Sequence, residues 1–74
     1  MNGKNRDELV KAETALHICI MNITNILEYM QVIAQKNPVA SVCNDMLNTT
    51  CDTMTDIETI LYKLNHEAGK HENV

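Results

Sequence analysis

Apolar residues recur along the chain at the alternating three- and four-residue spacing that is typical of a seam between packed helices. The first series runs through Leu9, Ala12, Leu16, Cys19, Ile23, Ile26, Met30 and Ile33. The second series runs through Ala40, Cys43, Leu47, Thr50, Met54, Ile57, Leu61, Leu64 and Ala68, with Thr50 as its polar member. This pattern predicts two long α-helices, over about 6–36 and 38–67.

Residues that favour helix ends lie where the two series begin and where they are separated. Pro38 is the only proline, and Asn37 before it is a good N-cap, so the second helix is expected to begin at Pro38. Asn5 and Glu8 fit a capping box that starts the first helix near residue 6. These signals separate the two helices by a very short connection.

A connection of this length makes the two helices antiparallel neighbours. Gly69 is expected to stop the second helix, leaving a flexible tail over 69–74. We therefore predict an all-α fold, a single antiparallel two-helix hairpin with coiled-coil-like packing over residues 1–74. The threonine-rich stretch 48–59 lowers helix propensity, so the middle of the second helix is expected to be its weakest part.

More apolar residues are present than one seam can cover. Folding the chain about residue 37 brings those beside the seam onto one face, which consists of Ala15, Ile18, Tyr29, Val32, Val39, Val42, Met46 and Ile60. A polar belt of Asn22, Asn25, Thr49 and Thr53 divides this face. An apolar patch of that extent indicates an interface, so we expect a homodimer, as a four-helix bundle, or a higher homo-oligomer.

Three further points concern the apolar residues outside the seam. A two-fold axis through the polar belt would let amide and hydroxyl groups pair across it and fix the register of the two copies. The other flank of the first helix, with Ile20, Leu27 and Ala34, could hold a partner protein helix. A monomeric hairpin that leaves these residues exposed is the simplest contrary interpretation.

Composition and charge argue against some kinds of binding partner, nucleic acid and membranes among them. The 74 residues carry a net charge of −4, and the six Lys and Arg residues are scattered without a basic stripe, which disfavours direct nucleic-acid binding. No apolar run approaches the length of a membrane span, and the polar start of the chain does not resemble an export signal. Three cysteines, an odd number, are expected to remain free thiols in a reducing cytoplasm.

The sequence contains no motif for catalysis, metal binding or cofactor binding. His66 and His71 are five residues apart, which is not the spacing of a helical zinc site. Cys19 and Cys43 fall in the predicted seam, where they are expected to pack as small buried apolar groups. We therefore expect no enzyme activity, no metal and no cofactor.

The length, the central turn and the heptads resemble the plasmid copy-number RNA-binding hairpins of the Rop type. That resemblance implies a two-helix chain that dimerises into a four-helix bundle. The first helix here lacks the row of basic groups that binds an RNA duplex, so the RNA-binding function does not transfer.

These observations favour a small adaptor, regulator or inhibitor that acts through its helix faces. One alternative is a nucleic-acid-directed modulator, either a weak RNA binder or an acidic mimic. Another is a helical bundle that sequesters a small molecule in a pocket lined by the polar belt.

Overall fold

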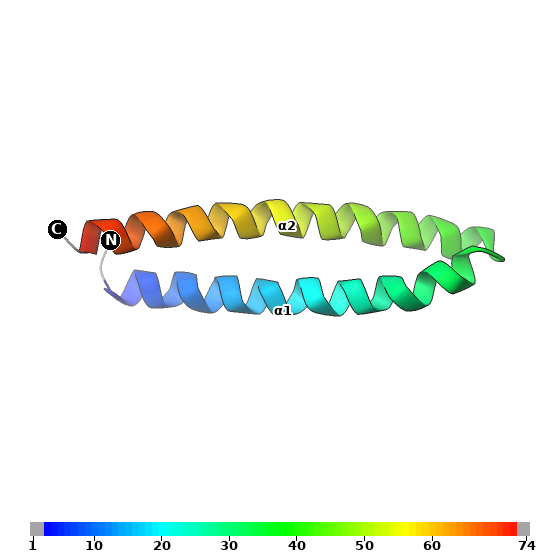
Figure 1. The fold of residues 1–74 in the computed structure, drawn as a ribbon, viewed down its shortest axis with the longest axis horizontal. Helices are drawn as coiled ribbons and strands as arrows, with labels where there is room; N and C mark the ends of the chain where they lie inside the picture. The colour runs from blue at the N-terminus through cyan, green and yellow to red at the C-terminus, as the bar shows by residue number, and fades with distance from the viewer. Residues whose placement is uncertain (1–2, 73–74) are drawn as a thin grey trace.

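The computed structural model describes residues 3–72, with side chains for residues 5–67. The chain forms two antiparallel helices, α1 over Gly3–Ala34 and α2 over Pro38–Glu72, which lie side by side along their whole length (Figure 1). The predicted all-α helical hairpin is confirmed. The first turn of α1 and the last turn of α2 lie at the same end of the rod, which we call the open end, and the turn between the helices forms the closed end.

The turn between the helices follows the predicted capping chemistry. The side-chain Oδ1 of Asn37 accepts hydrogen bonds from the backbone N–H groups of Val39 and Ala40, at 3.0 and 3.2 Å. Pro38 occupies the first helical position, where its lack of an N–H costs nothing. Asn37 is therefore the N-cap of α2, as its sequence position indicates.

The outer helix ends differ from the prediction. α1 begins at Gly3, so Asn5 lies inside the helix and is not its N-cap, and α1 ends at Ala34 instead of residue 36. α2 continues through Gly69 to Glu72, so the predicted stop is wrong, and residues 73–74 of the predicted tail lie outside the described residues. No glycine in the described part of the chain has a positive φ, so Gly69 does not form a left-handed cap.

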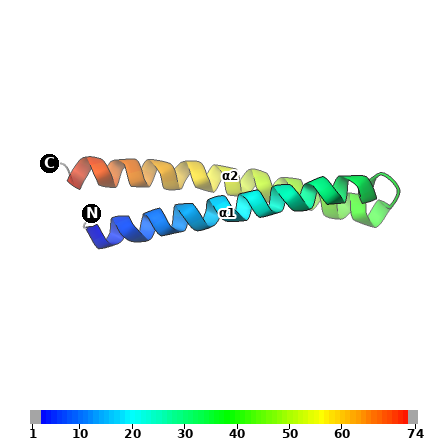
Figure 2. The ribbon, with the colours of Figure 1, turned by 60° about the horizontal axis from the view of Figure 1, so that its bottom comes forward.

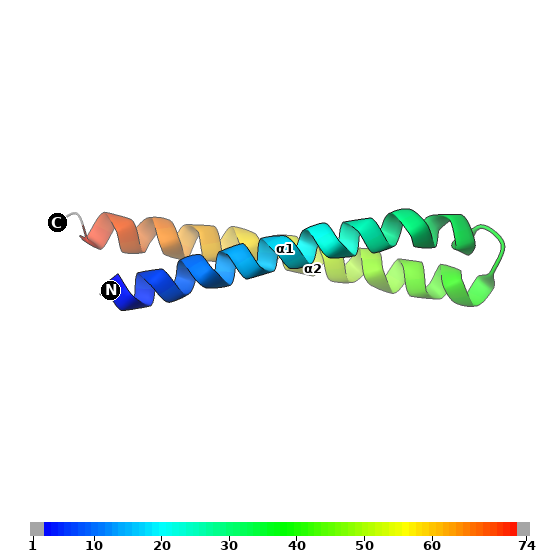
Figure 3. The same ribbon diagram turned by 90° about the horizontal axis from the view of Figure 1, so that it is seen from below.

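The contact between the helices is rotated relative to the predicted seam. We number heptads with Leu9 and Ala40 at position a. The a positions face the neighbouring helix as predicted, but the second contacting row is e instead of d. The e row consists of Glu13, Ile20, Leu27 and Ala34 in α1 and Asn44, Cys51, Glu58 and Asn65 in α2, all at least partly covered. Figures 2 and 3 show α1 and α2 crossing gently over one another along this contact.

The rotation overturns the expected burial of two cysteines. Cys19 and Cys43 occupy d positions and are exposed, whereas Cys51, at e, is half-buried. The physical reason is that α1 is largely apolar at d and at e as well as at a, so two different stripes could pack against α2. Packing along the e stripe also pairs Glu13 with Asn65 across the helices, at 2.6 Å.

The hairpin has a very thin core. Among the described residues only Ile23 and Ala40 are buried, at 6% and 9% exposure. The radius of gyration is 16.7 Å, where a compact domain of this length would have about 11 Å. The accessible surface is 5628 Å², about 1000 Å² more than the roughly 4600 Å² expected of a compact monomer of 8.4 kDa. Two helices alone therefore leave much of the apolar surface in contact with water.

Candidate interaction surface

One side of the hairpin carries most of the exposed apolar residues. With a and e in the contact, the d and g positions of both helices lie on the same side of an antiparallel pair. We call the apolar members of these positions the apolar face. They are Ala12, Ala15, Cys19, Ile26, Tyr29 and Ile33 of α1, and Val39, Cys43, Met46, Ile57, Ile60 and Leu64 of α2. All of them are exposed.

Several of these side chains are exposed far beyond what is usual for large apolar groups. Tyr29 is 74% exposed, Met46 66% and Ile60 56%. Near the closed end, Pro38, Val39, Val42, Cys43 and Met46 line an almost entirely apolar hollow of about 480 Å³. The face is therefore continuous with a shallow groove of a kind that an apolar side chain from another surface can fill.

The predicted interface residues are all exposed, but they divide into two groups. Ala15, Tyr29, Val39, Met46 and Ile60 are at g positions on the apolar face. The remaining three, Ile18, Val32 and Val42, are at c positions, which point away from the neighbouring helix at the outer edges of the hairpin.

Sequence reasoning missed seven members of the apolar face. The strict 3-4 spacing fits the a and d positions, so it assigned to the seam Ala12, Cys19, Ile26, Ile33, Cys43, Ile57 and Leu64. The signal that could have placed them is the width of the apolar arc. Helices in a bundle are apolar at three of seven positions, and the third row must face a second neighbour.

The polar belt also divides between the face and the edges. Asn22 and Thr53 are at g positions on the face, whereas Asn25 and Thr49 are at c positions. The hydroxyl of Thr49 donates to the carbonyl of Asp45, and that of Thr53 donates to the carbonyl of Thr49, each at 3.1 Å. The donors of these two threonines are therefore already used within α2.

Asn22 and Thr53 stand at the same height along the rod. The Nδ1 atom of His17 and the Oε2 atom of Glu58 are 3.0 Å apart, which sets the register of the two helices. Asn22 lies five residues after His17, and Thr53 lies five residues before Glu58. The polar residues of the face are therefore level with one another, with apolar residues on both sides.

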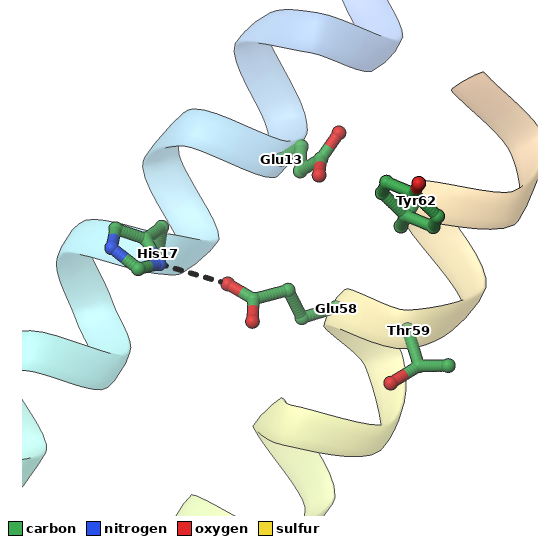
Figure 4. Close-up of a pocket in the computed structure, with 5 residues that line it drawn as sticks. All are labelled: Glu13, His17, Glu58, Thr59 and Tyr62. Carbon is green, nitrogen blue, oxygen red and sulfur yellow. Dashed lines mark hydrogen bonds and ion pairs between the residues drawn. The ribbon is translucent and has the colours of Figure 1, made fainter. Parts of the chain in front are cut away.

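A second cluster lies between the helices toward the open end. Glu13, His17, Glu58, Thr59 and Tyr62 line an open cavity of about 360 Å³ (Figure 4). His17 points at Glu58, while the carboxylate of Glu13 points away from His17. No group of three metal-ligating side chains converges within the described residues. The arrangement is that of polar side chains joining two helices, with the His17 ring still 63% exposed.

The same end contains the second polar contact across the helices. The Nδ2 of Asn65 donates to the Oε2 of Glu13 at 2.6 Å, while the Oδ1 of Asn65 is buried without a hydrogen-bond partner. The Oδ1 of Asn44, near the closed end, is also buried and unpartnered. Such groups cost free energy, so the a/e contact is an imperfect core.

The side opposite the apolar face is mostly polar. It comprises the b and f positions, which include Asp45, Asp52, Thr55 and Glu28, with Val10, Met21 and Tyr62 as exposed exceptions. No helix within the described residues combines the length and the apolar character that crossing a membrane requires. No known protein family, curated protein or solved structure matches this chain.

Proposed function

We propose that this chain is a non-enzymatic protein-interaction module that associates through its apolar face and acts as a homo-oligomer. The observation that carries the proposal is the exposed apolar face, which runs from Ala12 and Leu64 near the open end to Ile33 and Val39 at the closed end and is interrupted near its middle by Asn22 and Thr53. As an adaptor, regulator or inhibitor, it would present its helix surfaces to other proteins.

The area involved matches what a stable complex needs. A standard protein–protein interface covers about 800 Å² on each partner. The hairpin exposes about 1000 Å² more surface than a compact monomer of its mass. Covering the apolar face would therefore bring the exposed surface of each chain close to that of an ordinary folded domain.

The three free thiols support a reducing location such as the cytoplasm. Cys19 and Cys43 both lie on the apolar face, where association would cover them.

The test compares two methionines on opposite sides of the hairpin. Met46 lies on the apolar face and is 66% exposed, and Met21 lies on the other side and is 56% exposed. Sedimentation equilibrium should show wild type and Met21→Glu as oligomers and Met46→Glu as a monomer, because only Met46→Glu places a charge in the interface. Circular dichroism on the same samples reports whether each variant keeps its helices.

Two results would contradict the proposal. One is a wild-type protein that sediments as a folded monomer even at hundred-micromolar concentration. The other is an equal loss of association in both variants, which would show that an added charge weakens association whether or not it lies on the apolar face.

A further inference from the structure

We propose that the occupant of the apolar face is a second copy of this chain in the opposite direction, with the two-fold axis passing near Asn22 and Thr53. This inference rests on the proposed function and adds the arrangement of the two copies. In it, α1 packs on the partner's α1 and α2 on the partner's α2, so that the two turns lie at opposite ends of a four-helix bundle.

The first supporting observation is the placement of the polar residues of the face. Asn22 and Thr53 are both at g positions and level with one another. Apolar residues of the face extend for roughly equal lengths beyond them, from Ile33 toward the closed end to Ala12 toward the open end. An axis through this level therefore places Asn22 and Thr53 beside the same residues of the partner, and most of the apolar residues of the face against apolar residues.

The second observation is a match of side-chain sizes about the same level. Ala15 lies seven residues before Asn22 and Tyr29 lies seven after it, so each copy sets a small residue against the partner's large one. In α2, Met46 and Ile60 are each seven residues from Thr53, so that layer sets two large apolar side chains against each other. Facing layers that alternate large and small residues can interdigitate and fill the space between helices.

A second copy in the same direction would set Ala15 against the partner's Ile60 and Tyr29 against the partner's Met46, because these residues are level with one another. Charge separates the two arrangements. Glu8 and Glu67 are both at g positions and level with each other at the open end. Copies in the same direction would therefore stack Glu8 on the partner's Glu67, which is a like-charge contact.

The opposite direction replaces this repulsion with an attraction. Glu8 lies fourteen residues before Asn22, and Lys36 lies fourteen residues after it, in the turn just beyond the end of α1, so Glu8 comes level with the turn of the partner that carries Lys36. Lys36 is the only Lys or Arg between Lys11 and Lys63. Glu8 is also 3.5 Å from Lys11 of its own helix, so the new pair would extend an existing one. Glu67 then faces the partner's Val39 and no longer faces a carboxylate.

Reversing the charges of Glu8 and Lys36 tests the relative direction of the two copies. Sedimentation equilibrium should show that Glu8→Lys and Lys36→Glu each weaken self-association by about three- to tenfold, because each creates two like-charge contacts. The double variant should return to within about twofold of wild type, since the pair is restored with its signs exchanged. Glu28→Lys changes the net charge equally on the opposite side and should leave the association unchanged.

The outcomes separate this inference from the proposed function. Tighter or unchanged association of Glu8→Lys overturns the antiparallel arrangement and leaves the interaction module intact. A wild-type protein that does not self-associate overturns both.

A distance measurement provides an independent check. A spin label at Gln35→Cys, with the three native cysteines replaced by alanine, should give one intermolecular distance of about 40 Å, the rise of some 26 helical residues. A distance under about 20 Å would place the two turns together and overturn the arrangement.

Discussion

A pair of isoleucines one turn apart measures how much of the stability of this protein comes from the apolar face. Ile23 faces the neighbouring helix and is 6% exposed, whereas Ile26 lies on the apolar face and is 47% exposed. Substituting each by alanine removes the same atoms and gives the same gain in helix propensity, which is at most about 0.7 kcal/mol. The difference between the two costs therefore reports on burial.

The magnitudes follow from the exposed fractions. Removing three fully buried carbon groups costs about 2.4 kcal/mol at about 0.8 kcal/mol each. For an isolated hairpin, the 47% exposure of Ile26 reduces this to about 1.3 kcal/mol, and helix propensity reduces it further. If a second copy covers Ile26, the cost of Ile26→Ala rises to about 2–4 kcal/mol, comparable with the cost of Ile23→Ala, because a cavity term is added.

The assay is urea denaturation followed by circular dichroism, over two decades of protein concentration. Association predicts that the midpoint for wild type rises with protein concentration and that the cost of Ile26→Ala approaches that of Ile23→Ala at the upper end. A cost for Ile26→Ala that stays below about 1 kcal/mol at every concentration would show that Ile26 remains in water, and the reasoning about the apolar face would be refuted.

Three further predictions concern single side chains. Asn44→Leu should raise the free energy of unfolding by about 1 kcal/mol in urea denaturation, because it removes a buried oxygen without a partner; a loss of stability would show that this oxygen is satisfied in solution. Asn37→Ala should lower it by about 1 kcal/mol, because two backbone N–H groups of α2 lose their acceptor; an unchanged midpoint would exclude this capping role. In thiol alkylation followed by mass spectrometry, Cys19 and Cys43 should react faster than Cys51 in dilute protein and slow down as the concentration rises; rates independent of concentration would contradict coverage of the face.

The sequence was sufficient to predict the fold, because long helices with one strong break depend on local signals. Asn37 and Pro38 define the turn through their own backbone chemistry, and the 3-4 spacing defines the helices. The ends of the rod were predicted less well. Gly69 favours a stop, but a helix continues through a glycine that keeps a helical φ.

The contact between the helices could not be predicted by spacing alone. In α1 the a/d and a/e stripes are both apolar, so the choice depends on side-chain sizes across the contact and on polar pairs such as Glu13 with Asn65. Those pairs join residues more than forty positions apart, which no local pattern records. The positions of the exposed apolar residues were therefore predicted in part: Tyr29 and Met46 lie on the apolar face, whereas Ile26 was assigned to the contact between the helices and is exposed. That this face is an interface stays a prediction.

The threonines of α2 lower the cost of removing water from the polar centre of the apolar face. Six threonine hydroxyls in the hairpin donate to the carbonyl one turn earlier, and those of Thr50 and Thr53 lie on the apolar side. Because each of these hydroxyl groups already donates its hydrogen bond to a backbone carbonyl, the side chain can be buried without leaving an unsatisfied donor. The threonine residues at the centre of the face can therefore be desolvated at little cost in free energy. The side-chain amide of Asn22 still needs hydrogen-bond partners from whatever molecule covers the face.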